Sequence, residues 1–290
     1  MVIGALKDSF TVSALCKRLE IPRCSYYYAR KANERPDKHA EARRRIHTLF
    51  EQSKETFGSE RIWHALRHGD DGKEPLIISE KVVRRLMREE GLSVIYNKKK
   101  RTYSSYKGEI SAHPGDKVKR NFHADKPNEK WLTDITQFKL PSCKCYLSAI
   151  IDCFDGKVVS YELSRTPDAD LANSTLLAAI ACLEDGDRPI LHSDCGCHYR
   201  WPGWIAICDA EGIVRSMSKK ACSPDNAACE AFFGRLKNEF FYYRDWEGVS
   251  FEEFSVRLDS YIDYYNRLRK KKELGWLSPV EHRKALGYAA

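Results

Sequence analysis

Residues 131–138 have the sequence W-L-T-D-I-T-Q-F, which alternates apolar and polar side chains and carries Asp134. This alternation is typical of a β-strand with one buried face. A second aspartate, Asp194, ends the apolar run P-I-L-H-S-D, where a strand would give way to the loop C-G-C-H. Glu230 lies in D-N-A-A-C-E-A-F-F-G-R-L-K-N-E, which has the pattern of an amphipathic helix. The stretch from Trp131 to Lys237 therefore places three carboxylates in three different local settings.

The elements around these carboxylates predict a mixed α/β fold. Strands are expected at 130–140, 146–153, 157–163, 188–193 and 212–217, and helices at 168–183, at 204–211 and from Ser223 onwards. The pair Asp155-Gly156 is a strong hairpin signal between the second and third strands. Three antiparallel strands, then helix, strand, helix, strand and helix, is the order of a ribonuclease-H-like fold, a mixed five-stranded sheet with flanking helices. In that order the first and fourth strands are neighbours, so Asp134 and Asp194 are expected to meet at the sheet surface.

Clustered carboxylates repel one another unless cations lie between them. Mg²⁺ prefers oxygen ligands and shares its remaining positions with water and phosphate. Two such ions about 4 Å apart activate an attacking oxygen and stabilise the leaving one. We therefore expect Asp134, Asp194 and Glu230 to bind Mg²⁺ or Mn²⁺, as two ions, for phosphodiester chemistry. Lys237 lies two helical turns after Glu230 on the same face and is either a contact to the DNA backbone or a solvated lysine.

The composition of the 290 residues, 42% apolar and 31% charged, is that of a soluble globular protein with one large or two small domains. No run of 18 apolar residues is present, and the first residues lack a signal-peptide pattern. We therefore expect a cytoplasmic protein associated with the nucleoid. The 11 cysteines have irregular spacings unlike those of zinc sites, which predicts reduced, mostly buried thiols.

Positive charge is concentrated in the front of the chain. Residues 1–120 hold 27 Lys and Arg against 16 Asp and Glu, whereas residues 121–290 hold 22 against 25. This asymmetry predicts a polyanion-binding region attached to a catalytic body. A basic surface that serves only solubility is the alternative.

Two small helical units are expected in the basic half. Residues 9–30 predict two short helices, the first capped by Thr11 or Ser13, either as a helix-turn-helix reader or as a packing hairpin. A second unit has a helix capped by Ser59 and stopped by Gly69, and a later helix capped by Ser79. The exposed arginines of this later helix suit phosphates. They are Arg84, Arg85 and Arg88.

A basic linker is expected to follow and to lie along DNA, or to act only as a solvated tether. Its cationic cluster consists of Lys98, Lys99, Lys100 and Arg101. Near the end of the chain, 251–271 predicts a helix, and the basic run 267–272 is a second candidate contact to DNA. The predicted organisation is a helix-turn-helix-like segment at 1–35, a helical DNA-binding domain at 39–95, the linker at 96–121 and the catalytic core at 122–290.

Four segments carry a resemblance to a known family. They are P-N-E-K-W-L-T-D-I-T, L-H-S-D-C-G, D-N-A-A-C-E-A-F-F-G-R-L-K-N-E and Y-I-D-Y-Y-N-R-L-R…L-G-W-L-S-P-V-E. These segments resemble insertion-sequence transposases of the two-reading-frame kind, namely the second-frame (OrfB) product with its retroviral-integrase-like DDE core. Residues 57–92 also resemble the helix-turn-helix region that precedes this core.

The resemblance implies a site and its partners. Asp134, Asp194 and Glu230 are the implied catalytic triad, supported by Asn226 and Lys237. Terminal inverted repeats and target DNA are the implied substrates. A first-frame (OrfA) partner, or a fusion to it, would add end recognition, and a homo-oligomer is expected on DNA.

Three positions depart from the family pattern. His198 stands where glutamine is usual, Ala221 where a loop glycine is usual, and Pro224 replaces an aromatic residue. These departures leave the triad intact.

Two other functions stay open beside transposition. One is a ribonuclease-H-like nuclease without strand transfer, against which the basic helical units argue. The other is a catalytically silent DNA-binding protein, against which the intact triad argues.

Overall fold

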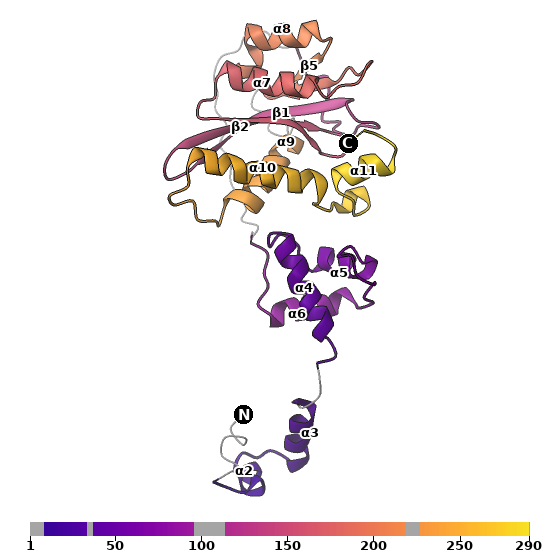
Figure 1. Ribbon diagram of the computed structural model, residues 1–290, viewed down its shortest axis with the longest axis vertical. Coiled ribbons are helices and arrows are strands. Elements are labelled where there is room, and N and C mark those ends of the chain that lie inside the picture. The colour runs from indigo at the N-terminus through magenta and orange to yellow at the C-terminus, as the bar shows by residue number, and fades with distance from the viewer. Residues whose placement is uncertain (1–8, 34–36, 96–113, 219–226, 290) are drawn as a thin grey trace. The chain divides into compact units, whose positions relative to one another are not determined.

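The computed structural model describes residues 9–33, 37–95, 114–218 and 227–289 (Figure 1). The chain divides into two compact units, Met1–Ser93 and Val94–Ala290. Across the described ranges, no helix is both long and apolar enough to cross a membrane.

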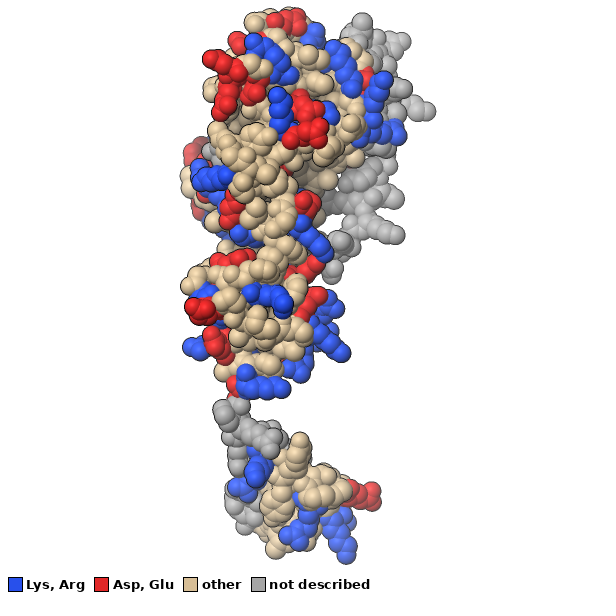
Figure 2. Space-filling view, turned by 90° about the vertical axis from the view of Figure 1, so that its right-hand side faces the viewer, with Lys and Arg blue, Asp and Glu red and all other residues tan. Residues whose placement is uncertain are grey.

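The first two helices of the N-terminal unit are α2 (Val12–Arg18) and α3 (Arg23–Asn33). The predicted cap of the first is confirmed, because the Thr11 hydroxyl accepts a hydrogen bond from the Ala14 N–H at 3.3 Å. Between Ser9 and Asn33 the chain carries five Lys and Arg and one acidic residue, Glu20. The charges drawn on this segment in Figure 2 are accordingly almost all basic.

Three further helices follow, α4 (Ala40–Gln52), α5 (Ser59–His68) and α6 (Glu80–Glu89). Ser79 caps α6 as predicted, and Gly69 ends α5 in the left-handed region, with φ 69°. The prediction for Ser59 is wrong. Gly58 occupies the cap position, and the Ser59 hydroxyl instead donates to Glu80 at 3.3 Å, linking α5 to α6.

The C-terminal unit contains the predicted five-stranded sheet. Its strands are β1 (Lys130–Lys139), β2 (Lys144–Asp152), β3 (Val158–Ser164), β4 (Ile190–Ser193) and β5 (Val214–Met217). Their order across the sheet is β3-β2-β1-β4-β5. The first three strands are antiparallel, while β4 lies parallel to both β1 and β5. This is the ribonuclease-H-like arrangement of integrase cores, which confirms the predicted fold class.

Helices cover both faces of the sheet (Figure 1). One face packs on α7 (Ala169–Ile180) and α8 (Pro202–Ala210), around the buried Trp131 and Trp204. The other packs on α9 (Ala227–Leu236), the π-helix η3 (Lys237–Phe241) and α10 (Phe251–Arg267), around Phe138 and Phe254. The remaining elements are the short 3-10 helices η1 (Cys197–Arg200) and η4 (Lys272–Leu274), and α11 (Pro279–Ala285).

The end of α10 corrects the predicted basic contact at 267–272 for two of its cations, Arg269 and Lys271. The helix stops at Arg267, and both Arg269 and Lys271 are only 3% exposed. Arg269 binds Glu239 of η3 through two hydrogen bonds of 2.6 and 2.8 Å. The Lys271 ammonium donates to the backbone oxygen of Asp155 at 2.8 Å. Arg269 and Lys271 thus fasten the segment after α10 to η3 and to the turn between β2 and β3, so these two cations are not available to DNA, whereas Arg267 and Lys272 are exposed.

Candidate active site and nucleic-acid interface

The sheet register places Asp134 and Asp194 side by side on the adjacent strands β1 and β4, and we call this pair of positions the catalytic row. Leu132 pairs with His192, and Thr133 pairs with Ser193, so the next residues along the two strands are the aspartates. Side chains two residues apart on a strand share a face. Leu132 belongs to the core beneath α9 and α10, so Asp134 points to that same face. Glu230 lies on α9, the helix that covers this face of the sheet.

The three carboxylates influence one another electrostatically. Burial, together with the negative charge of Asp194, raises the pKa of Asp134 to about 7, and Glu230 adds to this rise. Burial also raises the pKa of Asp194. The pKa of Glu230 is raised by burial and then by Asp194. Within the described residues, no three His, Cys, Asp or Glu side chains are gathered closely enough to hold one metal ion. The negative charges of these carboxylates therefore affect one another's pKa, but the three side chains do not form a complete set of ligands for one ion.

Backbone N–H groups orient the two aspartates. The Ile135 N–H donates to Asp134, and the Gly196 N–H donates to Asp194 Oδ1, both at 2.8 Å. Gly196 is the glycine of the L-H-S-D-C-G segment, and a Cβ added there would lie 2.8 Å from the same Oδ1 atom. Glycine therefore leaves the space in which the Asp194 carboxylate lies.

The change Gly196→Ala is therefore expected to displace the carboxylate of Asp194. A misplacement of about 1 Å at a reacting centre costs roughly 100-fold in rate. We expect a loss of that order in DNA cleavage with an unchanged melting temperature. Gly234→Ala is the matched control, because a Cβ at Gly234 meets nothing within 4 Å. Equal activity of the two variants would show that Gly196 does not position Asp194.

Lys237 lies beside the carboxylates at the first turn of η3. Its positive charge lowers the pKa of Asp134, and its ammonium lies 5.6 Å from the centre of the Phe138 ring. A π-helical turn directly after a helix often marks a functional site. The position of Lys237 agrees with the predicted supporting role, which stays a prediction.

Several predicted residues lie outside the described ranges. They are Asn226, Ala221, Pro224, Lys98, Lys99, Lys100 and Arg101. His198 is described and lies in η1, where its ring packs edge-on against Trp201 at 4.7 Å. Burial lowers the pKa of His198, although Asp194 and Asp168 oppose this.

The predicted arginines of α6 are exposed. Arg84 and Arg85 form ion pairs along the helix with Glu80 and Glu89, and Arg84 remains 62% exposed in its pair. Ion pairs this exposed contribute little to stability, so these arginines can leave their glutamate partners and bind a phosphate instead. Arg88 lies one turn beyond Arg84. The helix thus presents three arginines to solvent.

Two buried residues that the carboxylates affect electrostatically were missed by sequence reasoning. Tyr199 and Cys229 are buried, and the charges of Asp134 and Asp194 add to burial in raising the pKa of both side chains. Neither residue gives a local signal, because a single Tyr or Cys most often indicates ordinary core packing. Cys229 packs in the core under α9 and α10, whereas Tyr199 packs in the core on the other face of the sheet.

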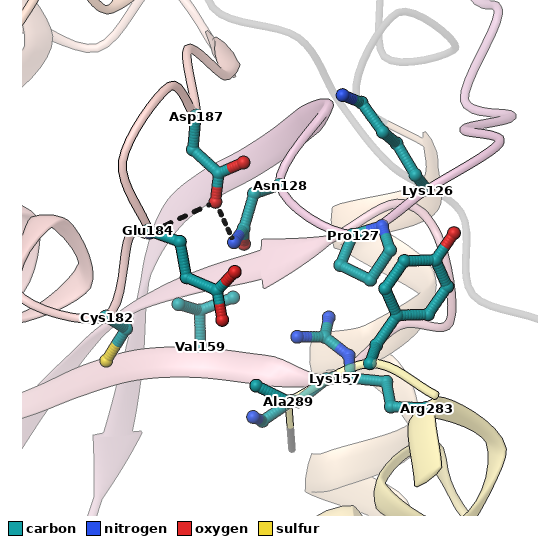
Figure 3. Close-up of a pocket in the computed structure, with 11 residues that line it drawn as sticks. Lys126, Pro127, Asn128, Lys157, Val159, Cys182, Glu184, Asp187, Arg283 and Ala289 are labelled. Carbon is teal, nitrogen blue, oxygen red and sulfur yellow. Dashed lines mark hydrogen bonds between the residues drawn. The ribbon is translucent and has the colours of Figure 1, made fainter. Parts of the chain in front are cut away.

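A cavity of about 400 Å³ lies apart from this site (Figure 3). Its lining combines Lys126, Lys157 and Arg283 with Glu184 and Asp187, and includes none of the residues predicted for catalysis. The mixture of cations and anions favours no single class of ligand. The carboxylate site therefore lies outside this cavity, on the face covered by α9.

Known protein families match about three quarters of the chain. Two integrase core domain models match residues 124–223 and 230–286, and an HTH-like domain model matches residues 37–100. The HTLV-2 integrase catalytic core domain in complex with magnesium is similar at 22% identity and a TM-score of 0.41, over 50% of this chain and 90% of that one. Structural likeness this weak adds nothing to a family assignment.

Sequence relatives are far closer. A protein named as a transposase of insertion sequence element IS1353 from Shigella flexneri is 45% identical over 99% of this chain, which spans about half (54%) of that relative. The protein named as transposase InsK of insertion sequence element IS150 from Escherichia coli (strain K12) is 36% identical, over 97% of this chain and 96% of its own length. The chain therefore belongs to the insertion-sequence transposases that carry an HTH-like domain and an integrase core domain.

Proposed function

We propose that the chain is a DDE-type transposase that cleaves DNA at the ends of its insertion sequence and joins the 3′ ends to target DNA. The observation that carries this proposal is the shared row of Asp134 and Asp194 on adjacent strands, under the helix that bears Glu230. We assign these three residues as the catalytic carboxylates, with Asn226 and Lys237 as supporting residues.

The donor set fits Mg²⁺ or Mn²⁺. All three donors are carboxylates whose pKa is raised by burial, and the repulsion between them calls for positive charge between them. Oxygen donors are the ligands that these ions prefer. When bound, two ions would supply Lewis-acid stabilisation of the attacking and leaving oxygens. Asp134, Asp194 and Glu230 are the residues that would hold these ions.

The protein's own groups position the DNA. The ammonium of Lys237, held over Phe138 beside Asp134, lies where it can bind a phosphate next to the scissile one. Arg84, Arg85 and Arg88 are proposed to bind phosphates at the element's terminal inverted repeats, with sequence-independent and salt-dependent affinity. Residues 1–95 are accordingly proposed to recognise the ends of the element, and residues 122–290 to catalyse cleavage and joining.

The proposed partners are terminal inverted repeats, target DNA, a second copy of the chain and the first-frame (OrfA) product. Two ends must be cut and joined in one event, which favours an oligomer on DNA. The excess of Lys and Arg in residues 1–120 supports a role in recognising the ends, which OrfA would extend.

Cleavage and joining of the DNA that flanks the gene test this function directly. Wild-type protein, with the first-frame product and Mg²⁺ or Mn²⁺, is expected to nick both ends of the element and to give joined products. Glu230→Gln is expected to give neither, while the exposed Glu211→Gln removes the same charge and retains both. Nicking without joining would favour the nuclease, and binding without nicking would favour the silent DNA-binding protein.

A further inference from the structure

A strap of residues, 114–123, lies on the edge of the catalytic sheet. The Gly115 carbonyl accepts a hydrogen bond from the Met217 N–H at 3.0 Å. The Lys117 N–H donates to the Ser216 hydroxyl at 2.8 Å. Both hydrogen bonds are to β5, so the strap is fixed to the sheet although its sequence is polar enough to predict a linker.

The strap contains a tight turn with an unusual backbone. The Asn121 N–H donates to the Val118 carbonyl at 2.9 Å, and Val118 is 4% exposed, so this residue anchors the turn. The two central residues, Lys119 and Arg120, have φ angles of 49° and 63°. Positive φ at both centres defines a type I′ turn, for which Asn-Gly is the favoured pair. Here the two positions hold long, exposed cations.

A comparison within the chain shows that this is not ordinary helix capping. Lys54 and Glu55 also have positive φ, at 52° and 62°, but they directly follow α4. The Glu55 N–H there donates to the Phe50 carbonyl of the last helical turn, as in a common helix ending. The Lys119–Arg120 turn follows no helix. Strained backbone of this kind persists mainly where function requires it.

The strap that carries the turn passes beside β4 and β5, on which Asp194 and Ser216 lie close together in the sheet. Ser216, which holds the strap, pairs with His192, and His192 is two residues before Asp194 on β4. Two residues span roughly 7 Å along a strand. Phe122, just past the turn, packs against His192 with 6.4 Å between the ring centres, which places the strap on the face to which Asp134 points.

We propose that the Lys119–Arg120 turn binds the phosphate backbone of the DNA strand that enters the active site, within a few nucleotides of the scissile phosphate. The turn projects two adjacent cations from a fixed base, whereas an Asn-Gly turn would relieve the strain and offer no charge. The proposal rests on the proposed transposase function for the identity of the DNA. Because phosphates carry no sequence information, the interaction is expected to strengthen binding to all DNA alike.

Two full-length variants test the proposal. Lys119→Asn/Arg120→Gly suits the backbone and removes both charges, whereas Lys119→Arg/Arg120→Lys exchanges the cations and keeps charge and strain. The melting temperature of each variant is measured. The affinity of each variant is then measured, over a series of salt concentrations, for a labelled duplex of the flanking DNA and for an unrelated duplex of equal length. Lys139→Gln/Lys144→Gln removes two charges from exposed positions at the far end of β1 and β2 and is the charge control.

The Asn-Gly variant is expected to melt a few degrees higher and to bind both duplexes at least tenfold more weakly. Its slope of log K against log salt is expected to fall by about 0.9 for each phosphate that the variant no longer neutralises. The exchanged variant and the charge control should bind like wild type. Unchanged DNA binding by the Asn-Gly variant, or a lower melting temperature, would overturn the proposal. If wild type bound DNA but did not cut it, the proposed function would fail while the binding comparison would still decide the role of the turn.

Discussion

Asp194→Asn is expected to abolish DNA cleavage and to leave DNA binding nearly unchanged. The substitution keeps the shape of the side chain, and Asn Oδ1 can still accept the hydrogen bond that the Gly196 N–H donates at 2.8 Å. It removes one negative charge from the row shared with Asp134. Metal ions contribute several kcal/mol to such transition states, so weaker metal binding should cost roughly 10³-fold or more in rate.

The same variant is expected to be more stable than wild type in a chelating buffer. The pKa of Asp194 is raised above its ordinary value, because burial disfavours its charge. An acid with a raised folded-state pKa destabilises the protein above its ordinary pKa, since the unfolded chain releases the proton more readily. The gain should therefore grow as the pH rises through the raised folded-state pKa and should vanish as the pH falls below the ordinary value of 3.8.

Asp209→Asn is the matched control, because Asp209 is 64% exposed and lies on α8. It should retain both cleavage and stability. Binding is measured by titration of a labelled duplex, and cleavage under single-turnover conditions. Loss of binding together with cleavage in Asp194→Asn would count against its assignment as a catalytic carboxylate.

Arg269→Met is expected to destabilise the catalytic unit by about 3–5 kcal/mol. The Arg269 side chain is 4% exposed and the Glu239 side chain 1% exposed, so the substitution would leave a buried carboxylate without its counter-charge. The Tyr261 hydroxyl, which donates to Glu239 at 2.9 Å, cannot neutralise that charge. In a unit of this size the melting temperature should fall by roughly 6–20 °C.

Two further variants separate charge from packing. Glu239→Leu/Arg269→Met/Tyr261→Phe removes every polar partner and should recover most of the stability, because apolar residues can replace a buried ion pair. Arg267→Met, two positions earlier, breaks only an exposed pair with Asp263 and should cost less than about 1 kcal/mol. Urea unfolding measures all three. Equal losses for Arg267→Met and Arg269→Met would contradict the buried role of Arg269.

The sheet could be predicted because its signals are local. The alternation around Asp134, the Asp155-Gly156 turn and the apolar run before Asp194 each depend on a few neighbouring residues. The order of these elements then restricts the topology, since few arrangements connect them. The meeting of Asp134 and Asp194 follows from that topology, although 59 residues separate them in the sequence.

The features that could not be predicted depend on hydrogen-bond partners that lie far away in the sequence. Arg269 resembles a DNA contact because cations are usually exposed, and only Glu239, 30 positions earlier, explains its burial. Ser59 resembles a helix cap, but its hydroxyl is bound to Glu80. The strap is polar, and its hydrogen bonds go to β5, about 100 positions away. No local pattern contains these partners.

Arg283 has a consequence for the synthesis of the protein on the ribosome. Its guanidinium binds the buried carboxylates of Asp152 and Asp155, which lie 131 and 128 positions earlier. At ordinary translation speeds, the hairpin that carries these aspartates is made roughly 6–25 s before Arg283. During that interval its buried charges lack their counter-ion, so the sheet is expected to remain loosely formed. The nascent chain should therefore form a compact sheet only after Arg283 has been made.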